Sequence, residues 1–141
     1  MMFTPEILEL RSKRELFEAS IKFRKLIFER KVLIVKGVGP LAEDEFESLC
    51  RILSCSSKES PFISWDFGHI LNLKNNEESE NYIFSNEKVP LHWDGAFHET
   101  PSILGFQCIK NTVMEGRTIF VNSVSAIAVS YTHLRAHETD R

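Results

Sequence analysis

The sequence has few cysteines, and their number and spacing do not suggest a structural framework. There are three, which is an odd number, and no two of them form a Cys-x-x-Cys pair. A disulfide framework and a thiolate zinc site are therefore both poorly supported. We interpret Cys50, Cys55 and Cys108 as reduced side chains.

Long apolar runs and dense basic runs are missing as well. No apolar run reaches the roughly 18 residues of a spanning helix, and the N-terminus lacks a basic region followed by an apolar stretch. We therefore expect a cytoplasmic protein without a membrane partner. The net charge of -3 and the absence of a Lys/Arg stripe argue against nucleic acid. A small-molecule partner is the expectation that remains, and the oligomeric state is not predicted.

The composition is that of one soluble globular domain, since 43% of the 141 residues are apolar and 26% are charged. Apolar residues at steps of three to four predict a helix from Pro5 to about Arg30 and a second from Leu41 to Leu53. Between them, the β-branched run Val32–Val35 predicts a buried strand, and the turn that follows contains Gly37 and Gly39.

From Pro61 onward the apolar period changes from that of a helix to two, which is typical of strands. Trp65 to Leu73 is predicted to form one strand. Shorter strands are predicted near three further segments: Tyr82–Phe84, Ile103–Ile109 and Arg117–Val121. This order of elements predicts an α+β fold in which N-terminal helices flank a β-sandwich or barrel.

One short motif suggests metal chemistry. In an extended chain, residues two apart point to the same side, so His92 and Asp94 can present an imidazole and a carboxylate to one metal ion, while Trp93 faces away. With a second histidine, such a pair forms the facial triad that leaves three positions open on Fe(II). The tripeptide alone is not specific, and the alternative is a hydrogen-bonded structural histidine.

The segment Val89–Phe97 and the later Glu115–Thr118, taken with the order of the preceding elements, resemble the taurine/2,4-D dioxygenase (TauD/TfdA) family over roughly residues 14 to 125. The resemblance implies N-terminal helices packed on a partial double-stranded β-helix (jelly roll), incomplete at the C-terminus. It implies that His92 and Asp94 bind Fe(II), with O2 as co-substrate.

The same resemblance implies that Thr118 binds the cofactor 2-oxoglutarate. Thr118 stands 24 residues after Asp94, where the family carries a Gly-Gly-x-Thr element whose hydroxyl contacts a 2-oxoglutarate carboxylate. One glycine of that element is missing here, since the local sequence is Glu-Gly-Arg-Thr. The alternative for Thr118 is a strand residue that reflects β-propensity.

Two further segments, Trp65–His69 and Ser85–Pro90, resemble the pyoverdine and isocyanide biosynthetic branch of the family. That implies a substrate derived from an aromatic amino acid. Four aromatic side chains are candidates for its pocket or, alternatively, for the core: Trp65, Phe67, Trp93 and Phe97. His69 and His98 are candidates for substrate contacts, but a lone histidine on an apolar strand is more often a structural residue, so neither is assigned to the site.

After Asn122, the resemblance predicts a helix and, further on, a distal histidine ligand and an arginine for 2-oxoglutarate, which this chain lacks. Residues 126–141 resemble translated adapter sequence and are expected to be a non-native tail, so His133, Arg135 and His137 are not assigned as ligands. The chain is expected to be an N-terminal fragment, inactive alone, of an iron dioxygenase. The alternatives are a non-catalytic α+β binding module or pseudoenzyme, and a zinc hydrolase that uses a tail histidine.

Overall fold

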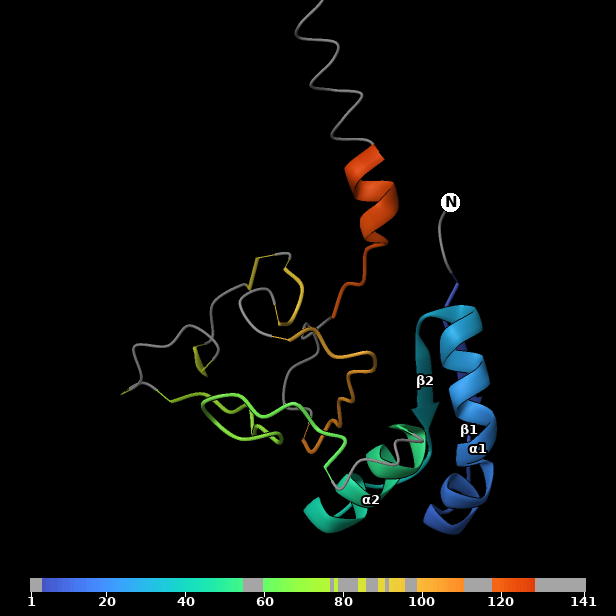
Figure 1. Ribbon diagram of the computed structural model, residues 1–141. Coiled ribbons are helices and arrows are strands. Elements are labelled where there is room, and N and C mark those ends of the chain that lie inside the picture. The colour runs from blue at the N-terminus through green and yellow to red at the C-terminus, as the bar shows by residue number, and fades with distance from the viewer. Residues whose placement is uncertain are drawn as a thin grey trace, which may run out of the picture. The chain divides into compact units, whose positions relative to one another are not determined.

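The structure is a computed structural model that describes residues 4–54, 60–76, 78, 84–85, 89–90, 92–95, 99–110 and 118–128. The chain divides into two compact units, one formed by Met1–Leu53 with Gln107–Arg141 and the other by Ser54–Phe106. The named elements of the described chain are β1 (Glu6–Glu9), α1 (Lys13–Arg30), β2 (Leu33–Lys36) and α2 (Glu43–Ser54) (Figure 1).

The strands β1 and β2 pair in parallel, in a register that places Glu6 opposite Leu33. Parallel neighbours need a crossover connection, and α1 supplies it, so the N-terminal part is a β-α-β unit. The pairing extends one residue beyond the strands, because the Leu10 N–H donates to the Lys36 carbonyl at 2.9 Å. Figure 1 shows α1 lying along the two strands.

The helix predicted from Pro5 begins only at Lys13, so the first part of that prediction is wrong. Ser12 is the N-cap, and its hydroxyl accepts a hydrogen bond from the Glu15 N–H at 3.2 Å. The Glu15 carboxylate accepts one from the Arg11 N–H at 2.8 Å. These bonds start the helix at its first turn, while pairing with β2 makes Glu6–Glu9 a strand.

The C-terminal end of α1 agrees with the prediction. Lys31 takes a φ of 68°, its N–H donates to the Ile27 carbonyl at 2.7 Å, and its ammonium group donates to the Phe28 carbonyl at 2.7 Å. A left-handed residue at this position satisfies carbonyls that the last turn leaves without partners. The helix therefore ends at Arg30, three residues before β2 begins at Leu33.

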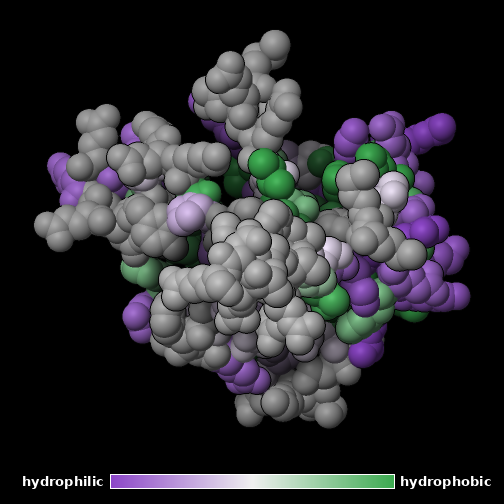
Figure 2. Space-filling model, turned by 90° about the horizontal axis from the view of Figure 1, so that it is seen from above, coloured by the Kyte–Doolittle hydropathy of each residue, from purple (hydrophilic) through white to green (hydrophobic). Residues whose placement is uncertain are grey.

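The core of the β-α-β unit and α2 is small. Four apolar residues are buried, namely Leu16, Phe23, Leu41 and Leu49, and half-buried side chains from both strands and both helices pack against them. The buried Ser20 satisfies its hydroxyl by donating to the Phe17 carbonyl at 2.6 Å. Many other apolar side chains reach the surface, and Figure 2 shows hydrophobic residues (green) beside hydrophilic ones (purple).

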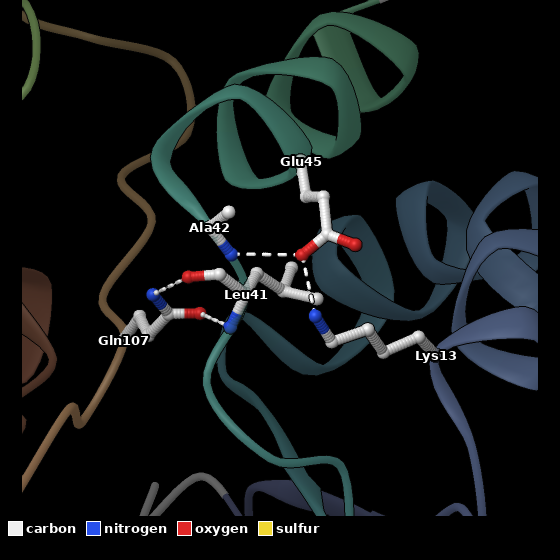
Figure 3. A network of polar contacts seen from close by, with 5 residues as sticks. All are labelled: Lys13, Leu41, Ala42, Glu45 and Gln107. Carbon is white, nitrogen blue, oxygen red and sulfur yellow. Dashed lines mark hydrogen bonds and ion pairs between the residues drawn. The ribbon is translucent and has the colours of Figure 1, made fainter.

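The predicted second helix is confirmed as α2. Its N-terminus is held by Glu45, whose carboxylate accepts hydrogen bonds from the Ala42 N–H at 2.8 Å and from the Lys13 ammonium group at 2.5 Å (Figure 3). The Lys13 hydrogen bond, followed by that of Ala42, lowers the pKa of Glu45 below its ordinary value. This carboxylate thus joins the starts of α1 and α2.

The two cysteines within the described residues, Cys50 and Cys108, are free thiols, as expected. Burial raises the pKa of the Cys50 thiol above its ordinary value of 9.0, and the nearby Glu47 carboxylate adds to the effect. A raised pKa keeps this thiol protonated and unreactive. Cys55 lies outside the described residues.

The strands predicted after Pro61 are not found where the structure describes the chain. Trp65 and Gly68 form an isolated antiparallel bridge around a tight turn, and residues 69–73, 103–109 and 118–121 form no strand. Tyr82 and Arg117 lie outside the described residues. The described sheet has two strands, so the jelly roll is not confirmed. Alternating apolar and polar residues indicate which side chains would share a face of a strand. A strand forms only when its backbone also pairs with that of a neighbouring segment, which the alternation does not reveal.

A short helix over 123–128 (orange-red in Figure 1) follows Asn122, where the resemblance predicts one. The Asn122 side-chain oxygen accepts a hydrogen bond from the Val124 N–H at 3.0 Å, which caps the helix. Residues 129–141 lie outside the described part of the chain, so the non-native tail stays a prediction. Within the described residues, no helix has the length and apolar character needed to cross a membrane.

Replacing Gly37 with alanine is expected to destabilise the fold by about 2 kcal/mol or more. Gly37 has a φ of +83°, and a Cβ there would overlap the carbonyl oxygen of Leu10. Urea denaturation followed by circular dichroism measures the effect. The matched control is Gly39→Ala, since a Cβ at Gly39 meets no atom within 4 Å. Equal loss of stability in both variants would contradict the steric argument.

The ion pair of Glu45 predicts a pH-dependent stability. Because its folded-state pKa is lowered from 4.5, the carboxylate stabilises the fold above about pH 4.5, and this contribution is lost as the pH falls through the lowered pKa. We expect Glu45→Gln to lower the urea midpoint at neutral pH, and the difference from the unmodified protein to shrink in acid. Glu43→Gln removes a carboxylate from the same turn and serves as the control. A difference that is constant with pH would refute the assignment.

Candidate functional site

The unit formed by Ser54–Phe106 is organised locally by a tight turn and by aromatic contacts. Trp65 and Gly68 exchange two backbone hydrogen bonds of 3.1 and 2.9 Å, and Gly68 takes the left-handed φ of +89° that the turn requires. The rings of Phe62 and His69 stack with centroids 4.8 Å apart, and Phe67 meets Phe84 edge-on. His69 is exposed, and its role stays a prediction.

The His92 imidazole is oriented by the backbone of its own segment. Its Nδ1 lies 2.8 Å from the Pro90 carbonyl oxygen. A carbonyl can only accept, so Nδ1 carries the proton in this hydrogen bond. In a neutral imidazole the other nitrogen, Nε2, then keeps its lone pair, which is the form that binds metal ions.

The Nε2 atom of His92 lies close to the carboxylate of Asp94. The distance between His92 Nε2 and Asp94 Oδ1 is 3.6 Å, and the two side chains are 47% and 37% exposed. Trp93, between them in the sequence, is 71% exposed. The structure therefore brings together the two residues that the sequence singled out as a pair.

The spacing of the pair is suitable for a shared metal ion. Two ligands about 2.1 Å from one ion are roughly 3.0 Å apart at a right angle and roughly 3.4 Å apart at the tetrahedral angle. The 3.6 Å between His92 Nε2 and Asp94 Oδ1 is slightly longer than either value. An imidazole nitrogen and a carboxylate oxygen suit first-row metals such as iron. The described residues contain no group of three or more His, Cys, Asp and Glu side chains placed to hold a metal. The pair would thus supply two of the protein ligands of a metal site.

Gly95 supports the turn that carries Asp94, a role that the sequence analysis did not assign. Its φ is +79°, and a Cβ there would lie 2.8 Å from the Glu99 carbonyl oxygen and 2.9 Å from Thr100 Cα. Only glycine accepts both the left-handed backbone and this close approach. The signal in the sequence was a glycine directly after His-x-Asp. The Pro90 carbonyl was also missed, because a backbone acceptor leaves no mark in a residue pattern.

Thr118, the residue implied for 2-oxoglutarate, has an exposed side chain and lies outside any helix or strand of the described residues. It belongs to the unit formed by Met1–Leu53 with Gln107–Arg141, whereas His92 and Asp94 belong to the other unit. Its role stays a prediction. The remaining candidates of the sequence analysis lie outside the described residues: Phe97, His98, His133, Arg135 and His137.

The aromatic side chains proposed for a pocket or the core differ in exposure. Trp65 is half-buried, and its indole nitrogen is a buried donor without an acceptor among the described residues. Phe67 and Trp93 are 52% and 71% exposed, so neither belongs to a buried core. Exposed aromatic rings are available to contact an aromatic ligand.

Comparison with known proteins supports the resemblance stated above. Residues 3–136 match the family described as "Taurine catabolism dioxygenase TauD, TfdA family". A 3-((Z)-2-isocyanoethenyl)-1H-indole synthase of Fischerella ambigua is 33% identical over 71% of the chain and 36% of its own length. No solved structure matches the chain.

Two tyrosine isonitrile desaturases are also similar. That of Erwinia amylovora is 28% identical over 85% of the chain and 41% of its own length, and that of Pseudomonas aeruginosa is 39% identical over 70% and 33%. The names of these relatives agree with the narrower resemblance to the isocyanide branch. The chain spans between 33% and 41% of the length of these curated relatives. It belongs to the TauD/TfdA family of dioxygenases.

Proposed function

We propose that this chain supplies the His-x-Asp iron ligands of an Fe(II)- and 2-oxoglutarate-dependent oxygenase that oxidises a small molecule derived from an aromatic amino acid. The observation that carries the proposal is the 3.6 Å distance between His92 Nε2 and Asp94 Oδ1. Family membership supports the reaction class, and the tyrosine- and indole-related names of the relatives support the substrate class.

Each residue of the proposed site has a distinct task. His92 Nε2 and Asp94 Oδ1 would hold iron, and the Pro90 carbonyl keeps the proton on Nδ1 so that Nε2 stays available. The Thr118 hydroxyl would donate a hydrogen bond to a carboxylate of 2-oxoglutarate. When bound, iron and 2-oxoglutarate together supply the power to oxidise a substrate C–H bond with O2.

The exposure of the pair is compatible with this chemistry. A facial triad must leave room on the metal for a chelating cofactor and for O2, so the ligands cannot be enclosed on every side. His92 and Asp94 are both partly exposed, and each keeps a surface that faces solvent. The exposed rings of Phe67 and Trp93 lie in the same unit and could contact an aromatic substrate.

A site with two protein ligands should bind metal weakly but at a defined place. We expect Mn²⁺, used as a redox-stable probe, to broaden the amide NMR signals of Trp93, Asp94 and Gly95 selectively in this chain. His92→Ala should remove the effect, because one of the two metal ligands is lost. His69→Ala, which removes a partly exposed ring from the same unit, is the control. The same broadening in the His92→Ala protein would rule out the pair as the metal site.

In a full-length protein that contains this chain, we expect turnover of 2-oxoglutarate to succinate that requires Fe(II) and O2. His92→Ala should lower that turnover at least about 100-fold, since removing a direct ligand costs more than removing a residue that only orients one. His69→Ala should leave it within a few-fold. Succinate formation is the measurement, and full turnover by the His92→Ala enzyme would disprove the iron-ligand assignment.

A further inference from the structure

The side chain of Gln107 forms two hydrogen bonds with the main chain of Leu41. Its Oε1 accepts from the Leu41 N–H at 2.8 Å, and its Nε2 donates to the Leu41 carbonyl at 3.0 Å. Figure 3 shows the Gln107 amide pointing at this main-chain segment, which leads through Ala42 into α2. In an antiparallel sheet, a residue can form two such hydrogen bonds, through its N–H and its carbonyl, with one residue of the neighbouring strand. Here the Gln107 side-chain amide takes the place of that backbone partner.

Leu41 needs such a partner because of its position. It lies after β2 and before α2, where neither the strand ladder nor the helix provides for its main-chain groups. Its side chain is one of the four buried apolar residues of the core, and it is only 8% exposed. Backbone groups at a buried position are costly when unpaired, so the Gln107 amide satisfies a real requirement.

Apolar packing contributes little to holding the segment around Gln107. Among residues 104–110, Gln107 is half-buried whereas the others are exposed, including Leu104, Phe106 and Ile109 at 40%, 64% and 60%. The buried core residues of the described chain all lie between Leu16 and Leu49. The two hydrogen bonds of Gln107 therefore provide a specific attachment that the surrounding side chains do not.

Gln107 also lies at the boundary between the two units along the chain. The chain leaves the first unit after Leu53 and returns to it at Gln107, and it carries His92 and Asp94 in between. Thr118 follows 11 residues after Gln107. We propose that Gln107 is a positioning residue, which fixes the start of the segment that leads to Thr118 by binding the Leu41 main chain. This inference rests on the proposed function for the role of Thr118 in binding 2-oxoglutarate.

The attachment can be tested without metal or cofactor by electron-spin distance measurements in this chain. The three cysteines are replaced with serine, and labels are placed at Lys22→Cys on α1 and at Ile119→Cys beside Thr118. Gln107→Met keeps the length of the side chain but loses both polar groups. We expect it to widen the distance distribution of this pair about twofold or more. A second pair, Lys22→Cys with Glu43→Cys, reports on the helices and should not change.

An unchanged distribution for the pair at residues 22 and 119 would overturn the proposal. If both pairs widen, the methionine variant has lost its fold, and Gln107→Glu decides. It keeps the acceptor for the Leu41 N–H and lacks the donor, so an intermediate width with intact helices supports the proposal. A width equal to that of the unmodified chain overturns it.

In the full-length enzyme, Gln107→Met should raise the KM for 2-oxoglutarate about tenfold while kcat changes less than about twofold, and Gln107→Glu should recover part of the loss. A proportional fall in kcat would indicate a general structural role and would overturn the link to Thr118. If no enzyme form turns over 2-oxoglutarate, the proposed function fails instead, and the distance measurement still decides whether Gln107 positions its segment.

Discussion

The packing of α1 against the parallel pair β1 and β2 organises the N-terminal part of the chain. A parallel pair cannot be joined by a tight turn, and two strands alone are barely stable in water. The helix solves both problems, because it connects the strands and covers them with Leu16 and Phe23. Leu41 and Leu49 then complete the core, and Glu45 ties the start of α2 to the start of α1.

The arrangement of the candidate metal ligands depends on local contacts and not on the packing of helices and strands. Their geometry is set within a few residues, by the Pro90 carbonyl that holds the His92 ring and by the left-handed turn at Gly95. Such local control lets the pair form in a unit whose described residues from 60 to 106 contain no named helix or strand. It also explains why the pair could be recognised in the sequence, since the two residues are only two positions apart, although Asp94 lies on a turn and not on a strand.

The role proposed for Thr118 requires the segment around this residue to be held in a defined position. Gln107 illustrates how a single amide can contribute to this. It binds a main-chain segment 66 residues away with two hydrogen bonds, where the neighbouring side chains are largely exposed. Polar attachment of this kind is specific in direction, whereas a small apolar contact would allow sliding.

The elements that could be predicted from the sequence depend on near neighbours in the chain: the end of α1, helix α2 and strand β2. The family could be predicted from the motifs and their order, whereas the metal-binding role of His92 and Asp94 stays a prediction. The other features depend on contacts between segments that are distant in the sequence. Glu6–Glu9 became a strand only by pairing with β2, and the alternating segment after Trp65 found no partner in the described chain. The need for glycine at Gly37 and the bonds of Gln107 depend on segments distant in the sequence. The spacing of apolar residues indicates which face of an element is buried. It does not indicate which distant segment pairs with a strand or packs closely against a glycine.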